Sequence, residues 1–320
     1  MPRYIRNTVI LAKVEPTPGT DAVPTGAADA VLVAEMSITP LDAQNVDRNL
    51  LRGYFGSSEQ LVGPACVKVG LKVELAGAGA AATAPSWGDL ILGCGFAEAL
   101  LSTPSRVEYT PISTSLKTLT IYYYDDGVLH KLWGVMGNVK LIAKVGDRPM
   151  LVFDFIGLDG GITAVANATP TLSSWKTPVT MAKANVTDIA FGCTYATGAL
   201  SGGTVYSSTG LELDIGNSVK FTPLLSAETI DIADRAVSGS VELDLTAANE
   251  VSFMSTVKAN TTQGMGLVIG TTTGNKIIIH GPAVQMINPK KVDKDGRRLI
   301  GYDLRFVPVS GNDELRLVSA

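Results

Sequence analysis

The chain has 320 residues, a formal net charge of −4 and 18% charged residues, fewer than the roughly 25% of ordinary soluble domains. Neither half carries the basic excess that is typical of a nucleic-acid-binding protein. The mean hydropathy of +0.24 arises without any apolar run of the ~20 residues that a membrane helix needs, so we expect much apolar surface to be buried between subunits.

Residues 1–36 are predicted to form an N-terminal arm. A β-like stretch at 4–14 precedes the segment 16–30, whose three prolines and two glycines show no helical or strand period. Such a composition favours a linker or an extension that follows the surface. Lys13 and Glu15 interrupt the first apolar stretch, so we expect no secretory signal.

Residues 42–63 are predicted to form a long loop between two strands, after a turn at Thr39-Pro40-Leu41. Connections of more than ~12–15 residues within a domain are usually functional or disordered. This one contains large apolar residues, which disordered linkers lack. We therefore expect a partner-binding loop with four anchor residues, Leu50, Leu51, Tyr54 and Phe55.

The segment 67–75 alternates strictly between apolar and polar residues, which predicts a strand with one face on a core and one face in water. A helix is predicted at 86–102 with Ser86 as its N-cap, although two glycines weaken it. A hairpin that turns at Asp126-Gly127 and a closing strand at 146–155 complete the first half.

The second half repeats this order of elements. A helix is predicted at 246–260 with Thr246 as its N-cap, and a hairpin turns at Gly274-Asn275. The matched segments are Thr39-Pro40-Leu41 with Thr222-Pro223-Leu224, 67–75 with 237–245, 121–134 with 267–281, and 146–155 with 296–306. A repeat of about 150 residues has the size of a whole domain.

We therefore predict a mainly β protein with two tandem copies of one β-sandwich or barrel domain, each flanked by one α-helix. The predicted divisions are an arm at 1–36, a first domain at 37–160, an interdomain link with opening strands at 161–210, and a second domain at 211–320.

No catalytic, cofactor or metal site is predicted. His130 and His280 fall in the second strand of each hairpin, without a convergent set of metal ligands. Asp293 and Asp295 lie in a stretch similar to a calcium loop, but arginines follow Gly296 where such a loop continues to a glutamate, so an exposed hairpin tip is favoured.

Two further features also favour a structural interpretation. Tyr122, Tyr123 and Tyr124 lack the surrounding basic residues that accompany base stacking on single strands. The cysteines Cys66, Cys94 and Cys193 are too few and too scattered for a disulfide framework, so we expect free thiols.

The order strand, long loop, strand, helix, hairpin, strand resembles that of the tail tube protein of long-tailed bacteriophages. The segments at 147–157 and 297–308 are similar to the closing strand of that family, and the resemblance spans most of 37–158 and 211–309. Single-domain members form rings of six. Two copies in one chain therefore imply a ring of three chains with pseudo-sixfold symmetry.

The resemblance implies a non-enzymatic virion protein that assembles in the host cytoplasm, contacts itself within and between rings, and meets tape-measure, terminator and distal tail proteins. DNA would pass through the lumen without specific binding. The loop 42–63 would then reach the adjacent ring, and Glu74, Glu242 and Asp244 are candidate lumen residues, whereas Lys68 and Lys72 on the same face argue against a uniformly acidic wall. The alternatives are a terminator or distal tail ring, or a surface-binding β-sandwich.

Overall fold

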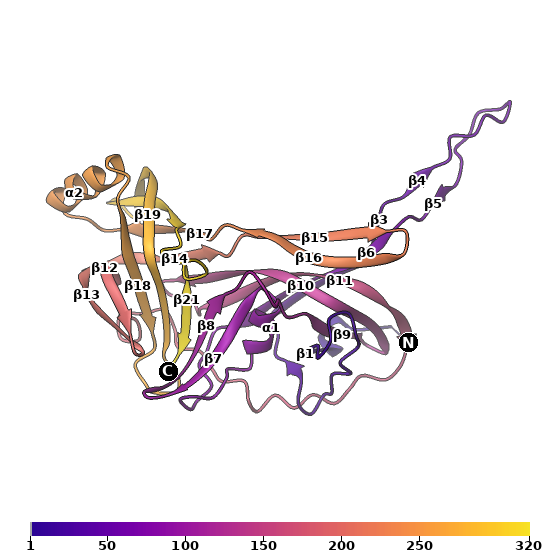
Figure 1. Cartoon of the computed structure of the whole chain (residues 1–320), viewed down its shortest axis with the longest axis horizontal. Helices are drawn as coiled ribbons and strands as arrows, with labels where there is room; N and C mark the ends of the chain where they lie inside the picture. The colour runs from indigo at the N-terminus through magenta and orange to yellow at the C-terminus, as the bar shows by residue number, and fades with distance from the viewer. Residues whose placement is uncertain (1) are drawn as a thin grey trace.

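The computed structural model describes residues 2–320 and is dominated by antiparallel β-strands (Figure 1). In the first half, four strands pair in the order β3 (Glu35–Ala43), β6 (Ala65–Glu74), β11 (Met150–Ala164) and β10 (Val128–Lys144). In the second half, four strands pair in the order β14 (Ser208–Asp214), β17 (Ser238–Leu243), β20 (Arg297–Phe306) and β19 (Ile277–Lys294). The order of pairing along the chain is therefore the same in both halves.

The two sets of four strands join into one sheet. β10 pairs with β14 in antiparallel fashion, with Lys140 opposite Asp214 and Lys144 opposite Gly210. The resulting eight-stranded sheet, from β3 to β19, crosses the whole molecule, and it is called the long sheet below.

A second layer packs against the long sheet in each half. β1 (Thr8–Val14) pairs with β2 (Ala30–Val31) and with β9 (Leu119–Asp125), and β9 pairs with β10. Correspondingly, β12 (Ile189–Ala196) pairs with β18 (Thr262–Ile269), which pairs with β19, while β13 (Ala199–Tyr206) extends this layer. A hairpin of β7 (Phe96–Ser102) and β8 (Ser105–Pro111) reaches the second half through β21 (Arg316–Ser319), which pairs with both β8 and β19.

Two excursions leave the long sheet at equivalent places. The first carries the short strands β4 (Val46–Asp47) and β5 (Gln60–Leu61) and projects away from the body. The second is a hairpin of β15 (Asn217–Leu224) and β16 (Ala227–Arg235), which lies along β10 and β11 of the first half (Figure 1). A 3-10 turn, η1 (Ile5–Asn7), precedes β1.

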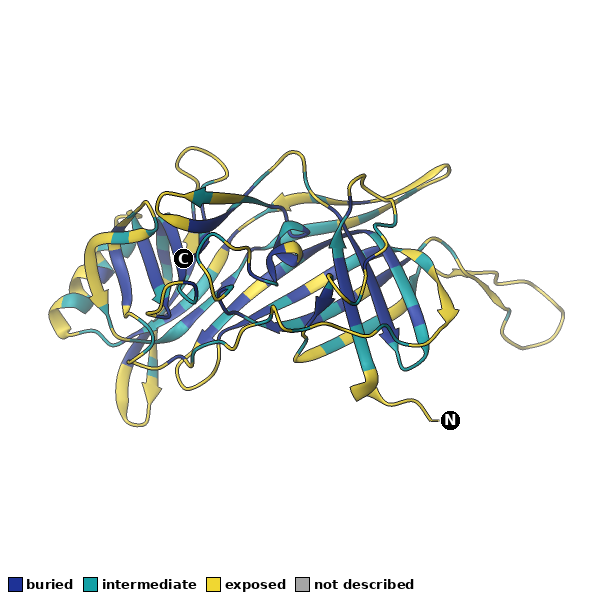
Figure 2. Ribbon diagram, turned by 90° about the horizontal axis from the view of Figure 1, so that it is seen from below, coloured by how far each residue is buried: buried dark blue, intermediate teal, exposed yellow. Residues whose placement is uncertain are grey.

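The predicted alternation of the strands is confirmed. The core faces of β6, β11, β10, β17 and β20 are buried and belong to one hydrophobic core that spans both halves (Figure 2). The hairpins predicted at 121–134 and 267–281 are present as β9–β10 and β18–β19. The core side chains on the two central strands of the first half include Val69, Leu71, Phe153 and Phe155.

The two predicted helices have different outcomes. The second, α2 (Ala247–Lys258), forms as expected, and the Thr246 hydroxyl accepts the backbone N–H of Asn249 as its N-cap. The first was predicted too long, because α1 (Gly88–Leu92) ends after five residues and the chain continues as β7. Gly95 adopts a left-handed φ of +77°, which ends the helical turn and redirects the backbone.

The Thr-Pro-Leu match does not mark equivalent positions, so this part of the predicted repeat is wrong. Thr39-Pro40-Leu41 lies inside β3 beside a register shift, not in a turn. Thr222-Pro223-Leu224 lies at the end of the β15–β16 hairpin. The two halves are alike in their order of strand pairing instead.

The expected arm is part of the fold over 8–14. Ile10, Leu11 and Ala12 are buried because β1 pairs along its full length with β9. β12 takes the same place beside β18 in the second half, so both halves open with this strand.

A buried ionic cluster connects the halves. The Glu108 carboxylate on β8 accepts hydrogen bonds from Arg106 Nε and the Tyr195 hydroxyl, each at 2.6 Å, and lies 3.3 Å from the Arg316 guanidinium. Burial by itself would raise the pKa of Glu108, but the Tyr195 hydroxyl and the two arginines outweigh it and lower that pKa. Arg316 also lies over the Tyr195 ring, 4.8 Å from its centroid. One carboxylate thus holds together β8, β12 and β21.

Candidate tube wall and subunit edges

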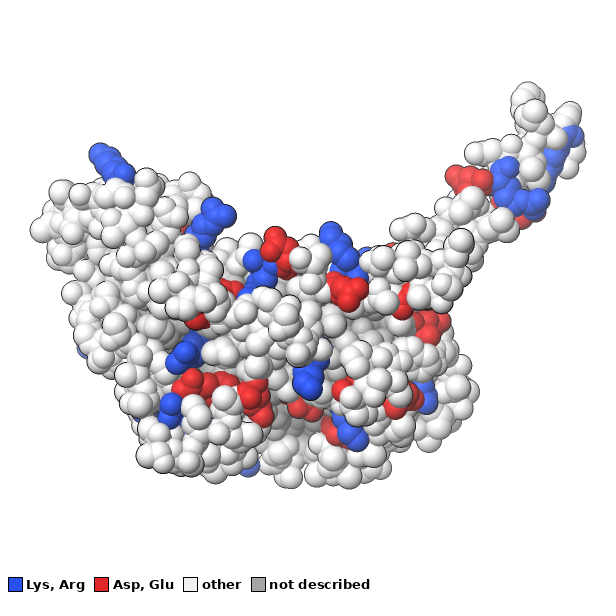
Figure 3. Space-filling model, viewed as in Figure 1, with Lys and Arg blue, Asp and Glu red and all other residues white. Residues whose placement is uncertain are grey.

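The face of the long sheet opposite the core is polar. Strand alternation places the charged residues of β6, β10, β14, β17 and β20 on this face, which shows interspersed acidic and basic groups along the top of the molecule (Figure 3). The lysines here are largely paired: Lys72 with Glu35 at 3.1 Å, Lys140 with Asp214 at 3.3 Å, Lys144 with Glu212 at 2.5 Å, and Lys68 with Asp42. The face is therefore close to neutral locally.

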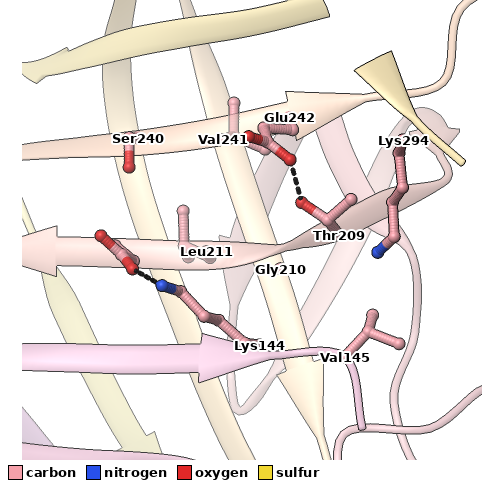
Figure 4. A pocket seen from close by; sticks show the side chains of 10 residues that line it. Lys144, Val145, Thr209, Gly210, Leu211, Ser240, Val241, Glu242 and Lys294 are labelled. Atoms are coloured by element: carbon pink, nitrogen blue, oxygen red, sulfur yellow. Dashed lines mark hydrogen bonds and ion pairs between the residues drawn. The ribbon is translucent and has the colours of Figure 1, made fainter. Parts of the chain in front are cut away.

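A hollow on this face marks the junction between the halves (Figure 4). Lys144 of β10 points across it to Glu212 of β14, and this contact raises the pKa of Lys144. Thr209 donates its hydroxyl hydrogen to Glu242 of β17 at 2.8 Å. Lys294, from the end of β19, points into the same hollow.

The three acidic residues predicted for the lumen lie near ends of strands in the long sheet. Glu74 ends β6 and pairs with Arg148 at 3.0 Å. Glu242 is held by Thr209, and Asp244, just after β17, pairs with Arg297. Each of the three carboxylates contacts an arginine or a hydroxyl group, so none of them is an isolated negative charge.

The four predicted anchor residues lie at the outer end of the β4–β5 excursion (Figure 1). Leu51 and Phe55 are fully exposed, Tyr54 is largely exposed, and Leu50 is about half exposed. Arg48 and Arg52 both pair with Glu59 across the loop and give it internal support. Four large apolar side chains are thus presented far from the core that could bury them.

The β15–β16 hairpin is the second-half counterpart of this loop. Its base packs on the first half: the Asn217 side-chain amide donates to the carbonyl oxygens of Cys94 at 2.7 Å and Gly137 at 3.0 Å, and Ile230 is buried. The tip of the hairpin does not pack on the first half, because Leu224 is largely exposed and Leu225 is fully exposed. The sequence interpretation missed this tip, although the adjacent pair Leu224-Leu225 ahead of an acidic stretch is its signal.

Both ends of the long sheet have an unpaired edge. Among residues 2–320, β3 pairs only with β6 along its length. The distal part of β19, residues 288–294, pairs only with β20, although the matching part of β10 pairs on both sides. Unpaired strand edges are templates for pairing with another chain.

The histidines lie in packed surroundings. The rings of His130 and Tyr123 are 6.2 Å apart, and those of His280 and Tyr195 are 5.9 Å apart. Burial lowers the pKa of both histidines. The described residues contain no cluster of three or more His, Cys, Asp or Glu side chains arranged to hold a metal ion. No helix in residues 2–320 has the length and apolarity to span a membrane.

Open sheet edges and exposed apolar tips are typical of a chain that associates with other chains. The profile of the phage tail tube protein family matches residues 5–308. The chain therefore belongs to the phage tail tube protein family. No curated protein matched the chain as a relative. Membership implies a structural subunit of the virion tail that self-associates into a tube and contacts other tail components.

Proposed function

We propose that three copies of this chain close into a pseudo-sixfold ring, and that stacked rings form a tail tube whose lumen conducts the genome during ejection. The observation that carries this proposal is the repeated pairing order, β3–β6–β11–β10 and β14–β17–β20–β19, joined through β10 and β14. Each chain is thus two wall units with an internal joint, and its two open edges require partners.

The dimensions of such a wall suit a DNA duplex. Three chains would supply twenty-four strands, which at about 4.8 Å spacing and about 40° tilt close into a barrel with a backbone diameter of roughly 48 Å. After about 5 Å of side chain on each side, roughly 38 Å would remain, against roughly 20 Å for a B-form duplex.

The charge of the polar face suits a lumen that DNA must leave. A basic wall would bind phosphates and release their counterions, which makes binding tight and sliding slow. Here Lys140, Lys144 and Arg148 are each paired with a carboxylate. We therefore place this face toward the lumen, with Glu74, Glu242 and Asp244 among its acidic groups.

The apolar tips are proposed to join adjacent rings. The hairpin inside the chain shows that its base packs on the neighbouring half while Leu224 and Leu225 stay exposed. By the same geometry, the β4–β5 loop would rest its base on the next chain and keep Leu50, Leu51, Tyr54 and Phe55 available for the adjacent ring. Each ring would then present six apolar tips of two kinds.

Electron microscopy of the purified protein in negative stain tests this function. We expect monomers in dilute solution, and rings and hollow tubes as the protein concentration is raised. A monodisperse monomer at all concentrations and salt conditions would overturn the proposal. Single rings that never stack would favour a terminator or distal tail ring. Tape-measure and terminator proteins are the proposed partners, with assembly in the host cytoplasm.

Reversing two charges on the polar face should make the tube retain DNA. In Glu242→Lys/Asp244→Lys, Lys144 and Arg297 gain like-charged neighbours, and the net charge of a ring of three chains rises by twelve units, because six carboxylates are replaced by six ammonium groups. We expect tubes of this variant to co-sediment with duplex DNA at low salt and to release it steeply as salt rises.

The matched control is Asp159→Lys/Asp188→Lys, which makes the same charge change at two exposed residues outside the polar face. Wild-type and control tubes should leave the DNA in the supernatant. Equal retention by the control and by Glu242→Lys/Asp244→Lys would show that the polar face does not line the lumen.

A further inference from the structure

We propose that β3 of one chain pairs with residues 288–294 of β19 in the neighbouring chain, in the register that joins β10 to β14 within the chain. The proposal rests on the ring described above. It assigns the residues of the contact between neighbouring chains in that ring, which is called the seam below. The partner is thus a second copy of this chain, bound edge to edge.

The register follows from matching the two halves. Asp154 of β11 lies opposite Asn138, and Asp303 of β20 lies opposite Ile287. Aligning Asp154 with Asp303 makes Val152 equivalent to Gly301 and therefore Lys140 equivalent to Lys290, because these residues face each other across the strands. Lys144 is then equivalent to Lys294.

The strands on the other side of each contact, β3 and β14, are matched in the same way. Gly70 of β6 lies opposite Asp154 and Ser37, whereas Ser240 of β17 lies opposite Asp303 and Glu212. Ser37 is therefore equivalent to Glu212, Thr39 to Asp214 and Glu35 to Gly210.

Transferring the internal joint to the seam places Lys294 directly opposite Glu35 of the next chain and Val292 opposite Ser37. Inside the chain, the joint is stabilised by Lys140–Asp214 and Lys144–Glu212 on the polar face. Within residues 2–320, the Lys294 side chain points into the hollow at the internal joint without forming an ion pair, and Glu35 is largely exposed and pairs with Lys72 at 3.1 Å. The seam would give Lys294 the carboxylate that it lacks.

A groove beside β19 supports the same docking. In the first half, Asn138, Asp154 and Ile156 line a groove that Asn217 and Val219 of the second half bound on one side, and the backbone N–H of Asn217 donates to Asn138 Oδ1 at 3.0 Å. In the second half, the equivalent residues Ile287, Asp303 and Arg305 line an open groove that no matching segment enters within residues 2–320.

The chain supplies an occupant for that open groove. Asn217 follows Asp214 by three residues, so the equivalent segment follows Thr39. Residues 40–43 of the next chain are the last residues of its β3, and residues 44–45 connect β3 to β4 at the base of the projecting loop. The open groove beside β19 and the open edge of β19 would thus both be filled by β3 and the residues after it from a second copy of the chain.

Engineered disulfides test the register. In Ser37→Cys/Val292→Cys, the two thiols face each other across the seam on one face of the sheet, and Cβ atoms of such opposed residues lie about 4.5–5.5 Å apart. We expect mild oxidation of assembled rings to give covalent dimers and trimers on denaturing gels, ending at three chains. In the control, Ser37→Cys/Asp293→Cys, a shift of one residue puts the thiols on opposite faces, and few cross-links should form.

A charge exchange provides a second readout. Glu35→Lys and Lys294→Glu should each raise the protein concentration at half assembly about tenfold, because each places like charges opposite one another. The double variant Glu35→Lys/Lys294→Glu should recover to within about threefold of the wild type. Circular dichroism of the free subunits should be unchanged.

The outcomes separate the seam from the function. If wild-type protein forms threefold rings but the Cys pair does not cross-link and the double exchange does not recover, the register is wrong and the tube remains. If wild-type protein forms no rings, the proposed function itself fails.

Discussion

Replacing Leu50, Leu51, Tyr54 and Phe55 together by serine is expected to abolish tube formation while leaving a folded subunit. These side chains lie at the end of a projecting loop, where Leu51 and Phe55 are fully exposed, so their removal costs the free chain little. In stacked rings they would be buried against a neighbour, and apolar anchors of this size carry most of the binding energy of an interface. Sedimentation and electron microscopy should show rings without tubes.

The matched control for this variant is Val251→Ser/Val309→Ser, which removes two exposed apolar side chains away from the loop. This control should form tubes of normal length. Normal tubes from the fourfold serine variant, or loss of tubes in the control, would contradict a stacking role for the loop tip. If the fourfold serine variant forms neither rings nor tubes, the loop tip contributes to contacts within a ring.

Replacing Glu108 by alanine is expected to lower the free energy of unfolding by about 3–5 kcal/mol, because it leaves the buried Arg106 without its carboxylate. The loss should also loosen β8, β12 and β21, which this carboxylate connects. Urea unfolding of dilute, unassembled subunits measures the change. Glu228→Ala, at an exposed site, should change the same quantity by less than about 0.5 kcal/mol.

The pH dependence gives a separate test of this cluster. Because the pKa of Glu108 is lowered in the folded protein, its contribution is present above the unfolded-state pKa, near 4.5, and is lost as pH falls through the lower, folded-state value. Glu108→Gln should therefore lose stability at neutral pH and depend less on pH below about 4.5 than the wild type. Parallel pH profiles for both proteins would contradict the role of the ionised carboxylate.

Much of the fold was predictable because strand alternation is a local property. The polar and apolar faces of β6 and β17, both hairpins and the Thr246-capped helix follow from residue order alone. The length of α1 did not follow from residue order. The segment Phe96–Ser102 has a helical composition, but it pairs with β8 as a strand, and strand pairing outweighs its helix propensity. The place of β1 depends on β9, more than a hundred residues away, which no local pattern reveals.

The candidate site was predictable only in part, for the same reason. An apolar loop of this length stands out in the sequence, and Leu50, Leu51, Tyr54 and Phe55 are indeed exposed, while their role as anchors stays a prediction. The open edges of β3 and β19 were not, since an edge is defined by the absence of a neighbour in three dimensions. The partners of Glu74 and Asp244 likewise come from strand ends that only the sheet brings together.

The number of chains in one ring is the most direct test of this account. Two wall units in each 33.5 kDa chain predict three chains, about 100 kDa per ring, and threefold symmetry with a pseudo-sixfold outline in averaged end-on images. Native mass spectrometry of rings from the stacking-deficient variant, together with the symmetry of wild-type tubes, measures both. A ring of six chains, near 200 kDa with true sixfold symmetry, would contradict the claim that each chain supplies two units of the wall.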